Sequence, residues 1–338
     1  MPLLSHLFRL LSLALPVIAL FSIEGVSAAV FPDVPKDHFA LEAVNYLTEK
    51  SVLTGYADGT FRPDQKVNRA EALKIIASAF VPVSDTVRLK SKDFTDVPDD
   101  IWYLPSIEWA MSKKVIDGPP KKTAFLPTQA VTKAEFLKML FAANGVDANA
   151  FGDIKLPLSS DVANTKEWSY PHLRYAVASG TTEISDGGLF GPTRELTRAD
   201  VSLLLYRFTL YRSGQRTQDL LTLTHEDVEN VITALSKGKA TEAEYASARA
   251  ILLARAAVLT EPDAVVVKVA VKIAEGYRAL TRAYRAGLNG DVNTVVKLSA
   301  DAATLAGQAR RLSPESKSLA DQLDKYSRSF SDQAKKKM

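Results

Sequence analysis

The feature that most constrains this 338-residue sequence is a block that occurs three times between residues 31 and 211. Each block holds an Asp-Val pair, then a Phe-x-Pro turn, then a basic residue followed by Ala and an acidic residue. The last segments read Asn68-Arg69-Ala70-Glu71, Thr132-Lys133-Ala134-Glu135 and Thr197-Arg198-Ala199-Asp200. A period of about 63 to 65 residues exceeds that of most helical solenoids, so each block is interpreted as a small helical unit of its own.

Apolar spacing predicts two helices in each block. In the first block Ala43, Val44 and Leu47 mark one buried helical face, and Leu73 and Ile76 mark a second. A loop rich in Gly, Asp and Pro separates them, and Gly55 and Gly59 are expected to take positive φ there. One such unit buries its apolar face poorly, whereas three together can share a core. The sequence therefore predicts a mainly α fold.

The recurrent basic segment can be explained first as a helix start. Three polar residues, each followed by an acidic residue three positions later, match the capping-box spacing. These pairs are Asn68 with Glu71, Thr132 with Glu135, and Thr197 with Asp200. Capping alone leaves the basic residues unexplained, because a cation at the first helical position is disfavoured by the helix dipole. The residues concerned are Arg69, Lys133 and Arg198.

An anion-binding site explains this placement better than a surface charge without a partner does. A helix N-terminus offers free N–H groups and favours negative charge. An adjacent Arg or Lys adds charge-assisted hydrogen bonds to a carboxylate or phosphate. The threefold occurrence favours this interpretation.

The first block resembles a known family. Its Phe-x-Asp-Val, Gly-Tyr-x-Asp-Gly-Thr-Phe-x-Pro and Val-Asn-Arg-Ala-Glu segments are similar to the S-layer homology (SLH) repeat. The resemblance implies three SLH repeats, at 31–83, 94–146 and 159–211, arranged as a pseudo-threefold helical prism. It also implies binding of a pyruvylated secondary cell-wall polysaccharide in the grooves between repeats.

The resemblance also implies roles for individual residues. Arg69, Lys133 and Arg198 would contact the acidic sugar; Asp33, Asp96 and Asp161 would line or shape the grooves; Gly55 and Gly118 would let the backbone approach the glycan. The second block has Lys in place of Arg, which gives up bidentate geometry. The third carries Ile184 where the loop glycine belongs. We therefore rank the sites first, second, third, and expect the third to be mainly scaffold.

Four aromatic residues follow the Asp-Val turns: Trp102, Tyr103, Trp168 and Tyr170. They could stack on sugar faces, but aromatic residues at the start of a buried helix are more often core. We expect them to serve packing, with an edge role in binding.

The N-terminal residues have the layout of a secretory signal. An apolar run from Leu10 to Ile23 precedes the small residues Val26-Ser27-Ala28, which predicts a signal peptide over 1–28. The alternative is a retained membrane anchor, but the run is shorter than the ~20 residues that span a bilayer. With no second candidate span, the prediction is an exported protein of the cell envelope or surface.

The region after residue 211 is predicted to be helical. After a linker at 211–218, five helices are expected within 219–336, with Pro262 opening the third and Thr241 and Glu244 forming a capping box. Short turns favour an antiparallel helical bundle, or a row of helical hairpins.

Several functions lack the residues they need. The chain has no Cys, and His38, His172 and His225 are isolated, so no metal site, cofactor or enzyme is expected. A net charge of +3 gives no footprint for nucleic acid. Two hypotheses remain. Either the repeats anchor the chain and present the bundle, or the bundle is the functional module and binds a protein partner, with the repeats supplying only location.

Overall fold

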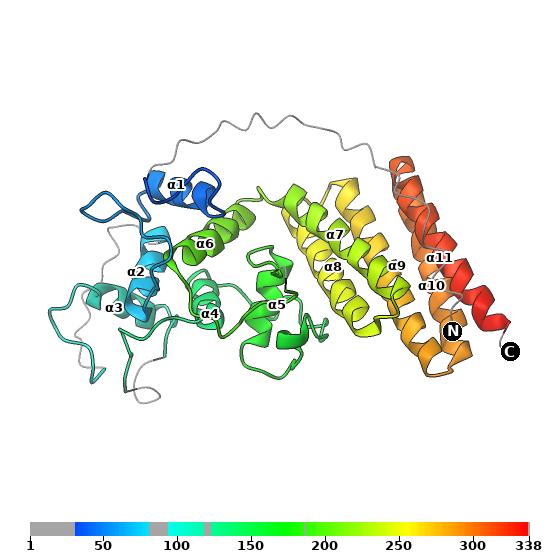
Figure 1. Ribbon diagram of the computed structural model, residues 1–338, viewed down its shortest axis with the longest axis horizontal. Helices are drawn as coiled ribbons and strands as arrows, with labels where there is room; N and C mark the ends of the chain where they lie inside the picture. The colour runs from blue at the N-terminus through cyan, green and yellow to red at the C-terminus, as the bar shows by residue number, and fades with distance from the viewer. Residues whose placement is uncertain (1–30, 81–93, 118–122, 186, 337–338) are drawn as a thin grey trace.

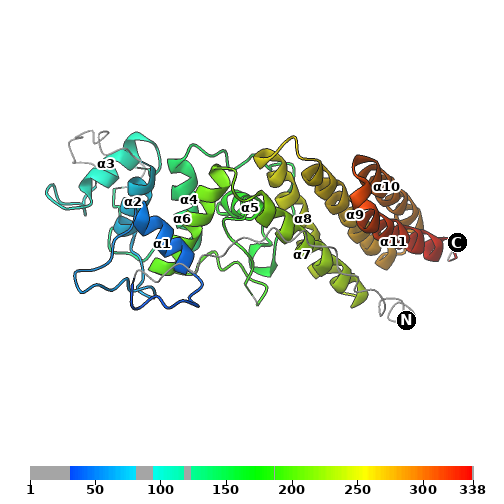
Figure 2. The same ribbon diagram turned by 90° about the horizontal axis from the view of Figure 1, so that it is seen from above.

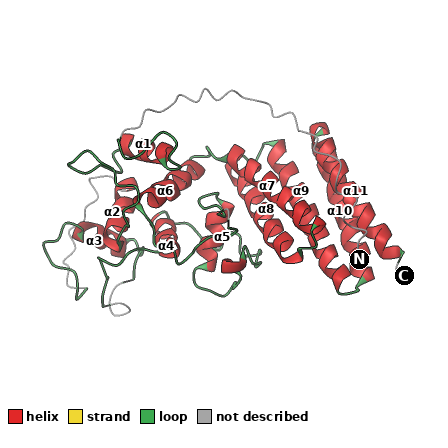
Figure 3. Cartoon of the chain, viewed as in Figure 1, coloured by secondary structure: helices red, strands yellow, loops and turns green. Residues whose placement is uncertain are grey.

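Helices form the architecture of the protein. The computed structural model describes residues 31–80, 94–117, 123–185 and 187–336 (Figure 1). Within these ranges β-type pairing is limited to three isolated bridges, and Figure 3 shows helices joined by loops. The prediction of a mainly α fold is therefore confirmed. The predicted signal segment, 1–28, and Gly118 lie outside the described residues.

Each of the three repeats contributes two helices. Their bounds are α1 Leu41–Glu49 and α2 Arg69–Phe80, α3 Leu104–Ser112 and α4 Lys133–Ala143, and α5 Tyr170–Ala178 and α6 Arg198–Arg212, with a short 3-10 turn η2 at Ser160–Val162. The second helix of each pair begins with reciprocal side-chain and backbone bonds between the cap residue and the acidic residue three positions later. These bonds satisfy N–H groups that a helix start leaves without partners.

The three repeats close into a ring through their backbone. The N–H of Val67 donates to the carbonyl of Leu196, that of Leu196 to Val131, and that of Val131 to Val67, each at 3.0 Å. All three side chains are buried. Since each residue donates to one repeat and accepts from the other, the pairing has pseudo-threefold symmetry.

Helix packing follows the same cycle. The second helix of one repeat packs on the first helix of the next, as α2 on α3 and α4 on α5, and α6 returns to pack on α1. Figure 1 shows α1 and α6 side by side although they are far apart in the sequence. The apolar faces of all six helices thus meet in a shared core, as one helix pair alone could not achieve.

The C-terminal helical bundle, as we call residues 217–335, contains five helices. Their bounds are α7 Thr217–Ser236, α8 Ala240–Thr260, α9 Val265–Leu288, α10 Val292–Leu312 and α11 Lys317–Lys335, the last preceded by a 3-10 turn η3 at Pro314–Ser316. The linker is shorter than expected, because α6 continues to Arg212 and α7 begins at Thr217. The capping box predicted for Thr241 and Glu244 is wrong: both side chains instead accept bonds from Arg285 of α9.

The bundle extends as a row of hairpins. Each helix packs on its neighbour in sequence, and α9 also packs on both α7 and α11. Figure 2 shows the ring and the bundle lying next to each other along the long axis of the molecule.

A buried ion pair joins the bundle to the ring. Arg249 of α8 donates to both carboxylate oxygens of Asp227 on α7, at 3.0 and 3.1 Å from Nε. It also donates to the carbonyl of Leu158, the residue just before the third repeat, at 2.9 Å. Both charged side chains are less than one-tenth exposed. Helix α8 also packs on α5, so the third repeat is the one that carries the bundle.

Candidate binding grooves between the repeats

The three basic residues each reach into the next repeat around the ring. Arg69 Nε donates to the carbonyl of Phe125 at 3.0 Å, Lys133 Nζ to Phe190 at 2.5 Å, and Arg198 Nε to Phe61 at 2.8 Å. We call these contacts the Arg69, Lys133 and Arg198 junctions. Each junction combines a cation from one repeat with a loop from another, so ranking sites repeat by repeat does not match the geometry.

The helix starts at these junctions do not offer the free N–H groups that we expected. The N–H of Arg69 donates to the carbonyl of Gln129, that of Lys133 to Arg194, and that of Arg198 to Gln65, at 2.9 to 3.0 Å. Carbonyls of the neighbouring repeat therefore occupy the positions that an anion would take. Any anion bound at a junction must be held by side chains.

The three aspartates of the Asp-Val pairs clamp the loops. The two oxygens of Asp33 accept the N–H groups of Phe61 and Arg62 at 2.8 and 2.6 Å. Asp96 and Asp161 make the same pair of bonds in their own repeats. Burial alone would raise the pKa of Asp33, but these N–H groups outweigh it and lower the pKa. The aspartates therefore shape the loops, and a contact between them and a ligand stays a prediction.

The clamp holds an unusual backbone conformation. The second residue of each clamped pair has positive φ: Arg62 at 57°, Leu126 at 62° and Gly191 at 63°. A side chain at positive φ costs roughly 1–2 kcal/mol, so two charge-assisted bonds offset that cost in the first two repeats.

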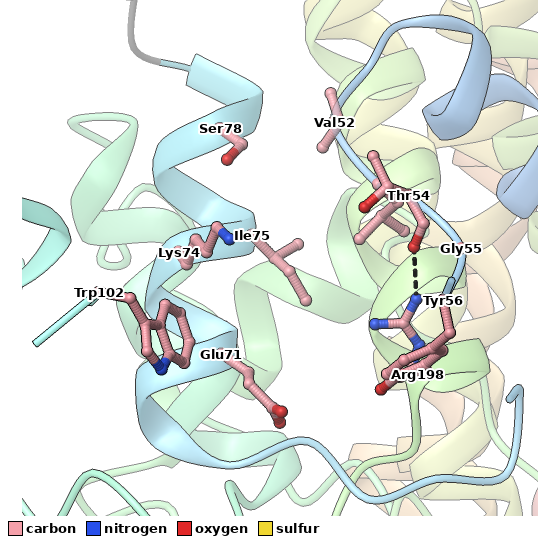
Figure 4. A pocket seen from close by; sticks show the side chains of 11 residues that line it. Val52, Thr54, Gly55, Tyr56, Glu71, Lys74, Ile75, Ser78, Trp102 and Arg198 are labelled. Carbon is pink, nitrogen blue, oxygen red and sulfur yellow. Dashed lines mark hydrogen bonds between the residues drawn. The ribbon is translucent and has the colours of Figure 1, made fainter. Parts of the chain in front are cut away.

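A groove opens at the Arg198 junction. It encloses about 240 Å³ between the loop after α1 and the exposed side of α2. Figure 4 shows Glu71, Lys74 and Trp102 on one side, with Tyr56 and Arg198 on the other. All three repeats therefore contribute to it, with Trp102 from the second and Arg198 from the third.

Two cations lie against aromatic rings in this groove. The Arg198 guanidinium lies 4.5 Å from the ring centre of Phe61 and 5.0 Å from that of Tyr56, and Lys74 Nζ lies 5.0 Å from that of Trp102. Arg198 also donates from Nη2 to the carbonyl of Thr54 at 2.9 Å. Its Nη1 has no hydrogen bond to another described residue, so this donor is available to a ligand.

Gly55 lines the groove for a reason other than positive φ. Its φ is not in the left-handed region, whereas Gly59 has φ of 81°, so the expectation holds only for Gly59. A Cβ on Gly55 would lie 2.3 Å from the ring of Phe31 and 2.9 Å from the carbonyl of Thr60. Glycine is needed because the Phe31 ring fills the space of a side chain.

The four aromatic residues divide into two pairs. Tyr103 and Tyr170 are buried, in agreement with a packing role, but Trp102 and Trp168 are 53% and 54% exposed. The expectation of packing is therefore wrong for the two tryptophans. Lys138 lies over Trp168 at 5.8 Å as Lys74 lies over Trp102, which repeats the arrangement at the Arg69 junction.

The Arg69 and Lys133 junctions differ from the Arg198 junction. At the Arg69 junction Arg69 Nη1 lies 3.5 Å from Glu135, and part of the adjoining loop lies outside the described residues. At the Lys133 junction, Lys133 is 8% exposed, and burial lowers its pKa to about 8. Such burial leaves Lys133 little access to a ligand.

Two features are absent from the part of the chain that the structure describes. No cluster of His, Asp or Glu in this part has the geometry to hold a metal ion. None of its helices combines the length and apolar character needed to cross a bilayer.

Comparison with known proteins identifies the first two repeats, whereas the third, at 159–211, lies outside the residues that the family model matches and stays a prediction. The model of the S-layer homology domain matches residues 30–73 and 93–137. The Surface-layer 125 kDa protein of Lysinibacillus sphaericus is 29% identical over 185 residues, which cover 54% of this chain and 15% of that protein. S-layer protein EA1 of Bacillus anthracis is 28% identical over 176 residues, 51% of this chain and 19% of that protein.

Fold, junctions and similarities define a class of protein built on a ring of helical repeats. The chain contains S-layer homology domains over residues 30–73 and 93–137, and these similarities support association with a cell surface or cell wall. It spans about a fifth or less of the length of the relatives named above. An endoglucanase of Bacillus sp. (strain KSM-635) is similar over 147 residues, 15% of its own length. The absence of enzymatic activity in this chain stays a prediction, as does a protein partner for the bundle.

Proposed function

We propose that the ring anchors the protein non-covalently to an anionic, pyruvylated secondary cell-wall polysaccharide, and that the groove at the Arg198 junction is its principal site. The bundle is then the module that is presented at the surface. The observation that carries the proposal is the pairing of two cations, Arg198 and Lys74, across a groove walled by Trp102 and Tyr56.

The groove supplies the three kinds of contact that an acidic sugar needs. Arg198 Nη1 and Lys74 can donate charge-assisted hydrogen bonds to a carboxylate. The exposed face of Trp102 offers an apolar surface beside a polar edge, which suits a sugar ring. The Glu71 carboxylate can accept bonds from hydroxyl groups.

The site is built before a ligand arrives. Arg198 is half-buried and held by the carbonyls of Phe61 and Thr54, so its guanidinium loses little freedom when it binds. Burial lowers the pKa of Arg198, yet the group stays protonated at any physiological pH. The positive charge is therefore constant.

The test is a binding titration with oligosaccharide fragments of pyruvylated wall polymer, against the same fragments after removal of pyruvate. Losing one charge-assisted bond weakens binding by about ten- to a hundredfold, so Lys74→Gln and Arg198→Gln should each reduce affinity for the pyruvylated fragments by that factor. The Lys74 side chain is exposed and donates no hydrogen bond to the backbone of another described residue, so its variant tests binding without disturbing the ring.

Charge-matched controls come from the bundle. Lys268→Gln and Arg282→Gln remove exposed cations of α9 and should leave affinity unchanged. Equal binding of pyruvylated and depyruvylated fragments, or full affinity in the Lys74→Gln, Arg198→Gln double variant, contradicts the proposal.

A further inference from the structure

The Lys133 junction is the counterpart in the third repeat of the groove that the first repeat forms at the Arg198 junction, but different residues line it. Residues of the first and third repeats correspond at a spacing of 129, as Phe190 does to Phe61 and Asp200 to Glu71. By this spacing Glu183 takes the place of Thr54, Arg207 that of Ser78, Leu203 that of Lys74 and Ile184 that of Gly55. Four of the residues that line the groove in the first repeat have thus changed character.

Two of these replacements form an ion pair. The Glu183 carboxylate lies 2.9 Å from Nη2 of Arg207, so a loop residue and a residue of α6 are bonded where the first repeat has Thr54 and Ser78 lining open space. Lys74, the exposed cation of the groove, is replaced by the apolar Leu203. The Lys133 junction therefore contains a carboxylate of its own, that of Glu183, and lacks a counterpart of the cation Lys74.

The bundle also covers the loop that carries Glu183. Arg216, just before α7, lies 3.6 Å from Glu183 and is 5% exposed. The residues that follow α5, Ser179, Thr181 and Thr182, are buried. A Cβ on Gly180 would lie 3.1 Å from Leu220 of α7 and 3.4 Å from Arg216. The start of α7 therefore covers the loop whose counterpart in the first repeat borders the groove.

From these contacts we infer that the Lys133 junction is not a polysaccharide site but the seat of the bundle, with Glu183 bound by Arg207 and Arg216 where an acidic sugar would otherwise bind. This inference rests on the proposed function, because it limits the chain to at most two sites for the acidic sugar. The same contacts hold the bundle on the ring through the third repeat.

The first experiment is a calorimetric titration of the full chain with a synthetic pyruvylated monosaccharide. The expected stoichiometry is no more than two, reduced by one in Arg198→Gln and unchanged in Arg207→Gln and Lys133→Met, with circular dichroism to verify that each variant is folded. Three sites, or the loss of one site in Arg207→Gln, overturns this inference and leaves the proposed function standing. No binding at all overturns both.

The second experiment does not depend on sugar. Arg216 is held by two carboxylates, Glu183 at 3.6 Å and Asp219 of α7 itself at 3.4 Å. Glu183→Gln removes the one that belongs to the ring, so the amide of Leu220, which bonds to the carbonyl of Arg216 at 2.9 Å, should exchange its hydrogen about tenfold faster. The matched control Glu195→Gln alters an exposed acidic residue of the same repeat and should leave that rate unchanged. An unchanged exchange rate of the Leu220 amide in Glu183→Gln contradicts the inference that this junction seats the bundle.

Discussion

Replacing Asp96 with alanine should lower the free energy of unfolding of the ring by about 2 to 4 kcal/mol. Its carboxylate accepts the N–H groups of Phe125 and Leu126, both at 2.8 Å. Hydrogen bonds to a charged group contribute about 1.5 to 3 kcal/mol each. Phe125 is 2% exposed and its N–H loses its partner, whereas water can reach the exposed N–H of Leu126 and recover part of the loss. The total therefore falls below twice the single-bond maximum.

Urea denaturation followed by tryptophan fluorescence measures this loss in the ring alone, because the three Trp residues of the chain, at 102, 109 and 168, all lie in the repeats. Asp100→Ala is the control: this exposed carboxylate lies four residues further along the same loop and should shift the free energy by no more than about 0.5 kcal/mol. If Asp96→Ala unfolds at the same urea concentration as Asp100→Ala, the aspartate does not clamp the loop.

Three other changes test the backbone, the buried cation and the junction with the bundle. Leu126→Gly should stabilise the ring by up to about 1 kcal/mol in the same assay, because glycine relieves the positive φ; destabilisation would contradict this. Burial lowers the pKa of Lys133 to about 8 against 10.5, so the unfolded chain binds an extra proton between those values. Stability of the wild type relative to Lys133→Met should accordingly rise from pH 8 to pH 10.5, by up to about 3 kcal/mol in urea titrations. Arg249→Met should cost about 3 to 5 kcal/mol in thermal unfolding, since it leaves Asp227 buried and unpaired, and adding Asp227→Leu should recover part of that loss.

Local patterns in the sequence were sufficient to predict the helices and the repeat. The apolar spacing around Leu73 and the cap residue Asn68 depend on neighbours within one or two turns, so they can be read without the fold. The short turns at Gly238 and Gly290 likewise separate the helices of the bundle, and both residues have positive φ. Such signals are local because helix formation is local.

Contacts between repeats could not be predicted in this way. Nothing near Arg198 in the sequence indicates that its guanidinium meets Phe61, 137 residues away. The need for glycine at position 55 arises from the ring of Phe31, and the burial of Lys133 from the loop of another repeat. Glu244 likewise has a cap spacing that its partner Arg285 overrides. These features depend on how the ring and the bundle close, which no window of sequence contains.

The basic residue at each helix start has a structural role before any ligand is considered. The carbonyl of a phenylalanine in the next repeat compensates the cation that the helix dipole disfavours, and this happens three times around the ring. What separates the junctions is how many donors remain. Arg198 donates from Nε and Nη2 and still has Nη1, because a guanidinium carries five N–H groups in a fork. Lys133 places its only side-chain nitrogen against one buried carbonyl, so its hydrogen bond joins two repeats and its burial leaves it little access to a groove. Under the inference above, Lys in place of Arg therefore retains the structural bond to the next repeat without a second side-chain nitrogen for a ligand, at the junction that the bundle covers.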